Sequence, residues 1–433
     1  MLEIDKIIPY IHNCQNTDKL RKILSETSTR LSQIYGQQND KSLEEKLLLI
    51  SNFIIPNQAT TLTRLASFYH ENNDVNKALL FAEKALEVTK HKNVQVLLNA
   101  AIIHAEYGKP ENAKKYYKTC LKLNKNCHKA SFGLSMEHFK ENKISKAWDF
   151  YYSRHYAFDM ESKVNKKILK LPLWDGKQKG KVIFYNEQGY GDFLFAMRYF
   201  HHLDNVDNEY KFFMDENMAV LVKSTKYSEK VITKVVKSDY RCSYLDIPYL
   251  FKIRRHENLQ YKNIFIQHNK VISKKPKIAV VFSGNKIYVG DKQRSIKVSE
   301  LNSILSDDRY EFCFLQKDLT DNSFYDKQYD IENLGTDLKN YLDTLEVLYS
   351  VDGLITVDTS VAHLGAAIGL PTFVLLNSNP DFRWHRDAKT TPWYSSWRIF
   401  KQNTRGNWDD AVSNCQTFVN EYFFKIFEPR NPP

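Results

Sequence analysis

Cysteine is scarce in this sequence: six occur in 433 residues, with neither the paired spacing of metal ligands nor the density of a disulfide scaffold. They stand at positions 14, 120, 127, 242, 313 and 415. Packing thiols in a reducing compartment are the simplest expectation. Long apolar runs are lacking too, since none approaches the ~20 residues of a membrane-spanning helix. The first six residues include no basic stretch ahead of an apolar core. We therefore expect a soluble, cytoplasmic protein.

A complete dinucleotide fingerprint is also missing. Gly189 and Gly191 follow an apolar run, but the third glycine and the downstream acidic residue of that fingerprint are absent, which disfavours a nicotinamide cofactor. The net charge is +11, yet charges of both signs are dispersed along the chain and no nucleic-acid recognition motif accompanies them. We expect no nucleic-acid partner.

The first third of the sequence contains a helical repeat. Two sets of small and aromatic residues match at an offset of 35 residues, and a third copy follows 34 residues later. The aligned positions are Leu62, Leu65, Ala66, Tyr69, Ala78, Ala82 and Ala85, then Leu97, Ala100, Ala101, His104, Ala113, Tyr117 and Cys120, then Leu134, Ser135, His138, Ala147, Tyr151 and Arg154. This period resembles the tetratricopeptide repeat, in which helix pairs stack into a superhelix.

Residues 1–165 are assigned to this repeat region, although the period before residue 55 is too weak to define a further copy. Tetratricopeptide arrays most often bind a peptide or protein partner. The alternatives are that the array only supports the next domain or mediates self-association.

A second pattern begins after the Leu-Trp-Asp-Gly stretch at 173–176, where an apolar run at 181–185 predicts a strand. A turn with Gly189 and Gly191 follows, and a helix is predicted to open at Asp192. Open α/β sheets bind ligands at the carboxyl ends of their strands, so this turn would raise Asp192 to the rim of the sheet. Plain helix capping by Asp192 would explain the same position. We assign residues 171–270 to this Rossmann-like half.

A similar half is expected over residues 276–415, with a C-terminal tail or helix at 416–433. Strands are predicted at 277–282, 311–315 and 354–357, alternating with helices, which favours a parallel sheet covered on both faces. Asp358, Thr359 and Ser360 follow the last of these strands and precede a predicted helix at 361–368. Such a helix start attracts anions such as phosphate. An ordinary crossover whose polar residues only cap the helix is the alternative.

Several motifs in order resemble glycosyltransferase family 9, the heptosyltransferase family, fused to tetratricopeptide repeats. They are Leu-Trp-Asp-Gly at 173–176, Glu-Gln-Gly-Tyr-Gly-Asp at 187–192, Ser-Gly-Asn at 283–285, Arg-Ser at 294–295, Leu-Gln at 315–316, Val-Asp-Thr-Ser-Val-Ala-His-Leu at 357–364 and Pro-Asp-Phe-Arg-Trp at 380–384. The arrangement is also similar to that of bacterial flagellin glycosyltransferases. The resemblance implies a GT-B fold, meaning two Rossmann-like halves in tandem.

The resemblance also implies roles for individual residues. Asp192 would be the general base. The donor's diphosphate would lie against Asp358, Thr359 and Ser360, with Lys286 and Arg294 contacting its phosphates. His363 could reach the same ligand or be a packing histidine. Glu187 could be a second carboxylate or, with Gly189 and Gly191, a support for the turn.

The resemblance implies an inverting glycosyltransferase, of hexosyl or heptosyl type, that uses a nucleotide sugar as substrate and needs no other cofactor. Since no Asp-x-Asp pair occurs in the sequence, metal-independent transfer is expected. The acceptor would be a protein or a surface glycan, recruited directly or through a partner by the repeats. The alternative is a non-catalytic tetratricopeptide adaptor that has kept a nucleotide-sugar-binding domain.

Overall fold

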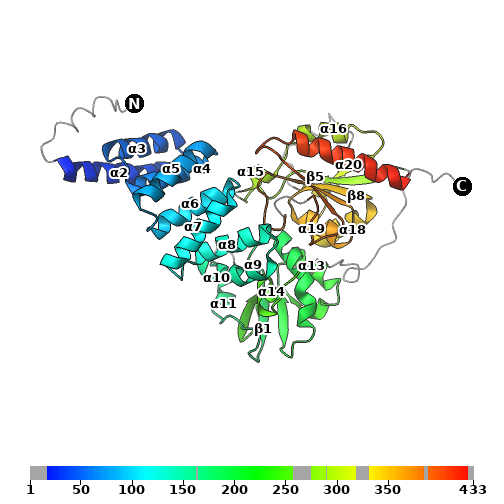
Figure 1. Ribbon diagram of the computed structural model, residues 1–433. Helices are drawn as coiled ribbons and strands as arrows, with labels where there is room; N and C mark the ends of the chain where they lie inside the picture. The colour runs from blue at the N-terminus through cyan, green and yellow to red at the C-terminus, as the bar shows by residue number, and fades with distance from the viewer. Residues whose placement is uncertain are drawn as a thin grey trace. The chain divides into compact units, whose positions relative to one another are not determined.

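The computed structural model of the chain describes residues 17–161, 164–256, 275–288, 290–317, 331–384 and 389–427 (Figure 1). These residues form two compact units. The first ends at residue 137 and also includes residues 156–158, while the second contains residues 138–155 and the chain from residue 159 onward.

The first unit is built from helices joined in pairs by short turns (Figure 1). In order they are α2 (Thr17–Gln37), α3 (Lys41–Ile54), α4 (Ala59–Glu71), α5 (Val75–Val88), α6 (Val94–Glu106), α7 (Pro110–Leu123) and α8 (His128–Lys140), which continues into the second unit. The helices α2 and α3, α4 and α5, and α6 and α7 pack as pairs. All of the repeat positions aligned in the sequence are buried, so the predicted tetratricopeptide-like array is confirmed.

The turn inside each pair repeats with the same backbone geometry. Asn39, Asn73, Gly108 and Asn142 all have positive φ, at 62°, 62°, 67° and 60°. In each case the next backbone N–H donates to the carbonyl five residues earlier, as Asp74 does to Tyr69 at 2.9 Å. Asparagine and glycine tolerate this left-handed conformation. Because α2 and α3 are joined by the same turn as the later helix pairs, they form a further repeat of the array. The sequence pattern before residue 55 was too weak to define this copy.

The second unit begins with the short helices α9 (Ile144–Tyr151), α10 (Arg154–Ala157), whose last two residues belong to the first unit, and α11 (Lys166–Leu169). A four-stranded parallel sheet follows, with strands β1 (Val182–Tyr185), β2 (Tyr210–Phe213), β3 (Val231–Ile232) and β4 (Tyr240–Ser243) in the order β3-β2-β1-β4. Its main helices are α12 (Tyr190–Ala196), α13 (Glu216–Lys223) and α14 (Ile247–Leu250). The strand predicted at 181–185 is confirmed as β1.

A second parallel sheet has six strands in the order β10-β9-β8-β5-β6-β7. They are β5 (Lys277–Val281), β6 (Glu311–Phe314), β7 (Glu332–Asn333), β8 (Gly353–Val357), β9 (Thr372–Leu376) and β10 (Trp397–Lys401). Its helices are α15 (Asp291–Arg294), α16 (Asn302–Leu305), α18 (Tyr341–Ser350), α19 (Ser360–Ala367) and α20 (Asp409–Phe427). Figure 1 shows α16 and α20 on one face of this sheet and α18 and α19 on the other.

The core of the second sheet explains this layering. Alternate strand residues such as Val280, Ile355 and Phe373 pack with Cys415 and Phe423 of α20 in one buried cluster. Helix α19 packs closely against the opposite face of the sheet. A Cβ on Gly365 would lie only 2.8 Å from the Leu354 side chain. The chain is therefore a helical repeat array followed by two parallel α/β sheets in tandem, the predicted GT-B class of fold.

Two helix starts differ from the sequence expectation by a short distance. The helix predicted to open at Asp192 begins at Tyr190, because Gly189 is its N-cap and the Asp192 carboxylate, in the third helical position, accepts the Gly189 N–H at 3.1 Å. The helix predicted at 361–368 begins at Ser360 and ends at Ala367. Gly369 follows with φ of 77°, a backbone conformation that favours glycine.

Candidate functional site

The predicted donor residues meet where the order of the second sheet reverses. Strands β5 and β8 are neighbours, but the chain leaves β5 toward β6 and leaves β8 toward β9, on opposite sides. The loops after these two strands therefore run in opposite directions. The point between them is a topological switch point, where open α/β sheets bind ligands. Arg294, from the loop after β5, donates from Nη1 to the backbone carbonyl of Asp358 after β8, at 2.8 Å. The structure thus brings Arg294 to the Asp358–Ser360 turn.

The start of α19 is not closed by a capping side chain. Thr359 is the N-cap, with extended backbone at φ −135° and ψ 168°, and it makes no side-chain capping bond. Its hydroxyl lies 3.2 Å from the Thr356 hydroxyl, while the Ser360 hydroxyl lies 2.7 Å from that of Tyr341. This arrangement disfavours the alternative in which the turn only caps the helix. The N-cap side chain therefore does not occupy the start of α19, where the positive end of the helix dipole lies.

Hydrogen bonds among the polar side chains of α15 and Ser295 fix the position of Arg294. Asp291 accepts from Arg294 Nε at 3.0 Å and from the Ser295 hydroxyl at 3.0 Å. A Cβ on Gly284 would lie 2.4 Å from both Arg294 Nη2 and Asp291 Oδ1, so a larger residue there would displace these two groups. By contrast, Lys286 is exposed on the loop ahead of α15.

Asp192 reaches the same region from the first sheet. Helix α12 packs against α19, and a Cβ on Gly191 would lie 3.1 Å from His363 Cδ2 and 3.6 Å from the Ser360 Cα. Gly191 therefore allows the two helix starts to approach. Burial raises the pKa of the Asp192 carboxyl, and Arg383 opposes that shift.

Arg383 is the site residue to which the sequence reasoning assigned no role. Its Nη1 donates to Asp192 Oδ1 at 2.7 Å, and its Nε lies 3.2 Å from Asp381 Oδ1. The next residue, Trp384, donates its indole N–H to Asp358 Oδ2 at 2.9 Å. Burial raises the pKa of Asp358 to about 6, although Arg383 lowers it. The available signal was a cation between Phe382 and Trp384, in a motif noted only for its resemblance to the family.

His363 fits the packing alternative. It is buried among aromatic rings, and its Nδ1 lies 3.0 Å from the Tyr394 hydroxyl. Burial holds the pKa of its imidazole well below the usual value. A neutral histidine enclosed in this way supports the close contact of α19 with α12, and the residue is 1% exposed, which leaves little surface for a ligand.

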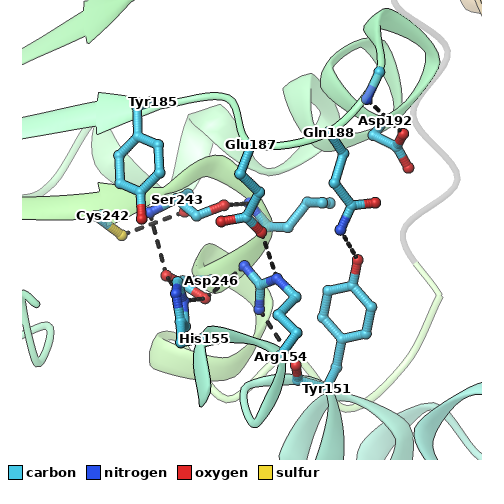
Figure 2. Close-up of polar contacts among 12 residues, drawn as sticks. Tyr151, Arg154, His155, Tyr185, Glu187, Gln188, Asp192, Cys242, Ser243 and Asp246 are labelled. Atoms are coloured by element: carbon cyan, nitrogen blue, oxygen red, sulfur yellow. Dashed lines mark hydrogen bonds and ion pairs between the residues drawn. The ribbon is translucent and has the colours of Figure 1, made fainter. Parts of the chain in front are cut away.

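Glu187 faces away from Asp192 and into a buried ion cluster (Figure 2). Its Oε1 accepts from Arg154 Nε at 2.5 Å, and Arg154 Nη2 donates to Asp246 Oδ1 at 2.8 Å. His155 Nε2 lies 2.8 Å from Asp246 Oδ2. These contacts join Glu187 to Arg154 of α10, and through Arg154 to Asp246 after β4, and not to Asp192.

The described residues contain no group of three or more histidine, cysteine, aspartate or glutamate side chains placed to hold a metal ion. Among the same residues, no helix is both long and apolar enough to cross a membrane.

Comparisons with known proteins identify a tetratricopeptide repeat in the first unit. The tetratricopeptide repeat family model matches residues 94–127. No curated protein matches the chain by sequence. Among solved structures, a mutant of the Thermobaculum terrenum O-GlcNAc transferase is 10% identical, with 94% of each chain covered and a TM-score of 0.35. MamA is 17% identical over 31% of this chain and 76% of its own, with a TM-score of 0.27. YrrB, a tetratricopeptide protein with an unusual peptide-binding site, is 16% identical over 30% and 66%, also with a TM-score of 0.27. Likenesses this distant carry no argument about activity.

Proposed function

We propose that this chain is a glycosyltransferase that moves a sugar from a nucleotide-sugar donor to a protein or surface-glycan acceptor. The observation that carries the proposal is the hydrogen bond between Arg294 and the Asp358 carbonyl at the switch point of the second sheet. The Asp192 carboxylate lies on α12, which packs against α19, the helix that follows this turn. Anion-binding groups and a candidate base therefore lie on neighbouring elements.

The donor's diphosphate would bind at the start of α19. The amides after Thr359 would donate to its oxygens, and Ser360 and Arg294 would add a hydroxyl and a positive charge. Lys286 is exposed on the loop ahead of α15, and we assign it to the outer phosphate or the sugar. Asp358 would not face the phosphate directly, since its carboxylate accepts the Trp384 indole N–H.

The chemistry follows from these assignments. Asp192 takes the proton of the acceptor hydroxyl while the acceptor oxygen forms a bond to the anomeric carbon of the sugar. The bond from that carbon to the diphosphate oxygen breaks, and its electron pair leaves with the diphosphate. Cations and helix amides stabilise the developing charge. Attack opposite the leaving group inverts the anomeric centre, and we assign the reaction to metal-independent, inverting transfer of a hexose or heptose.

The repeats would recruit the acceptor or a partner protein. Stacked helix pairs offer an extended concave surface, a form that suits a peptide better than a small sugar. This assignment favours a protein acceptor or an accessory protein over a free glycan.

One observation favours a second candidate function. The Asp192 carboxylate is bound by Arg383 and is therefore not free to take a proton from an acceptor. A non-catalytic adaptor that binds a nucleotide sugar without turning it over would retain such a pair. Donor binding is common to both candidates, whereas turnover belongs to the first alone.

Thermal melting across a panel of nucleoside diphosphates and sugar nucleotides tests the donor site. A ligand that binds only the native state at about 100 times its Kd adds about 2.7 kcal/mol of stability. We expect one nucleotide to raise the melting temperature of the wild type, and Arg294→Ala and Asp358→Ala to remove most of that rise. Arg309→Ala is the matched control, because Arg309 is an exposed cation of the second sheet paired with Asp307. If no nucleotide shifts the wild type, the proposed function is wrong.

A further inference from the structure

The Arg383–Asp192 ion pair joins two elements that are distant in the sequence, and the mechanism proposed above leaves it unexplained. Asp192 belongs to α12 beside the first sheet, and Arg383 belongs to the loop after β9 of the second sheet. A resting ion pair on the general base would oppose the proton transfer that the base must perform. Either the pair is only structural, or it opens during the reaction.

We propose that Arg383 moves from Asp192 to the diphosphate when the donor binds, so that one cation both frees the base and stabilises the leaving group. This inference rests on the proposed function. It makes Arg383 a catalytic residue of the transfer and makes the base competent only in the presence of donor.

The position of Arg383 supports the exchange. Trp384, the next residue, holds the Asp358 carboxylate, and Arg294 holds the Asp358 carbonyl, so Arg383 lies beside the turn assigned to the diphosphate. The charge of Arg383 lowers the pKa of the Asp358 carboxyl as well as that of the Asp192 carboxyl. A short side-chain movement would therefore change its partner.

Exposure and charge allow the exchange. The Arg383 side chain is 9% exposed and the Asp192 side chain 16%, so the pair is reachable from solvent at one edge. A diphosphate carries more negative charge than a carboxylate and accepts two parallel hydrogen bonds from a guanidinium. The donor would therefore compete well with Asp192 for Arg383.

The groups around Asp192 determine how its carboxyl titrates once Arg383 has left. Asp381 lies on the same loop as Arg383, and Glu187 on the same turn as Asp192, and both raise the pKa of the Asp192 carboxyl. His363 faces the turn from α19, with the pKa of its imidazole held well below the usual value by burial. Tyr151 on α9 keeps its proton, since burial raises its pKa.

Within this set, Arg383 is the group that favours the ionised carboxylate by contact, together with the Gly189 amide. Its departure therefore raises the proton affinity of Asp192. During transfer, the acceptor hydroxyl proton passes to Asp192, while the electron pair of the broken bond goes to the diphosphate oxygen that Arg383 contacts. A more basic Asp192 takes that proton more readily.

Calorimetric titration with the nucleoside diphosphate that gives the largest melting shift tests the exchange. Titrations at one pH in two buffers of different ionisation heat measure the protons taken up per nucleotide bound. We expect the wild type to take up a fraction of a proton between pH 6 and 8, and Asp192→Asn to bind the nucleotide without that uptake. We expect Arg383→Gln to bind at least about tenfold more weakly, equivalent to about 1.4 kcal/mol. Arg309→Gln should bind as the wild type does.

Equal affinity in wild type and Arg383→Gln would overturn the exchange, and so would equal proton uptake in wild type and Asp192→Asn. If Arg383→Gln fails to fold, Arg383→Lys keeps a charge at the site, and the comparison of wild type with Asp192→Asn decides alone. Binding by the wild type without proton uptake contradicts the exchange but leaves the donor site intact. Absence of binding by the wild type contradicts the proposed function itself.

Discussion

At the scale of single residues, the Asp358 carboxylate is partly buried and accepts the Trp384 indole N–H at 2.9 Å. Burial raises the pKa of this carboxyl to about 6. The burial of Asp358 has a measurable consequence.

Asp358→Asn should make the protein more stable at neutral pH. In the folded state the pKa of Asp358 is about 6, against an ordinary value of 3.8, so the native state binds a proton that the unfolded state releases between these values. The wild type therefore loses stability as pH rises from about 4 to 6, on the order of 2 kcal/mol. The asparagine side chain still offers an oxygen to the Trp384 indole N–H. Because it does not ionise, the variant does not lose stability as the pH rises.

Urea unfolding at pH 4.5, 6.0 and 7.5 measures the effect. The advantage of Asp358→Asn over the wild type should grow with pH across this range. Glu346→Gln, at an exposed carboxyl on α18, should show no such trend. A difference between Asp358→Asn and wild type that stays constant with pH would contradict the account of Asp358.

At the scale of elements, the sequence predicted best where burial follows a regular period. The repeat positions are small or aromatic at fixed spacing, and all proved buried. The strands β1, β5, β6 and β8 were predicted because apolar runs of four or five residues are bounded by turn residues. The start of α12 was misplaced by two residues, because a carboxylate in the third helical position satisfies the same amides as one at the N-cap.

Arg154 shows where the repeat period stops being informative. It aligns with Ala85 and Cys120, which are apolar packing positions in the earlier repeats. In the third copy the position instead carries an arginine that pairs with Glu187 and Asp246, from the loops after β1 and β4. These two strands are neighbours at the switch point of the first sheet. Its partners are 33 and 92 residues away, so no local pattern could indicate them.

Arg154→Met should be strongly destabilising. Burial alone would raise the pKa of the Asp246 carboxyl, but Arg154 and His155 hold it well below the usual value. The second partner of Arg154, Glu187, is also buried. Removing the arginine leaves both carboxylates without their guanidinium, at a cost of about 3–5 kcal/mol. Adding Glu187→Gln and Asp246→Asn to Arg154→Met should recover much of that loss, because the buried charges are then removed together.

Guanidinium chloride unfolding measures both effects. Arg254→Met is the matched control, since Arg254 pairs with Asp149 of α9 while both side chains stay more than 40% exposed. An exposed pair contributes up to about 1 kcal/mol. If Arg154→Met costs no more than Arg254→Met, the buried cluster does not stabilise the fold in the way described.

At the scale of the whole molecule, the order of its parts was predictable and the completed site was not. The change from a helical period to alternating strands and helices near residue 165 indicated repeats followed by two α/β sheets. The tandem order of those sheets placed Asp192 on one and Arg294 with Asp358 on the other. The Arg383–Asp192 pair joins residues 191 positions apart and depends on how the chain folds after β9. The sequence therefore indicated Asp192, Arg294 and Asp358 as candidate site residues, but not the contact of Asp192 with Arg383.

The most direct test of the central claim, that Asp192 and the α19 turn form a transferase site, is release of nucleoside diphosphate from sugar nucleotides. Each donor would be incubated with a mixture of small sugars and serine-, threonine- and asparagine-containing peptides. We expect the wild type to release the diphosphate and Asp192→Asn to lose about 10²–10⁴-fold of that activity while it still binds the nucleotide. A wild type that binds a sugar nucleotide and never releases the diphosphate, or an Asp192→Asn variant as active as the wild type, would contradict it.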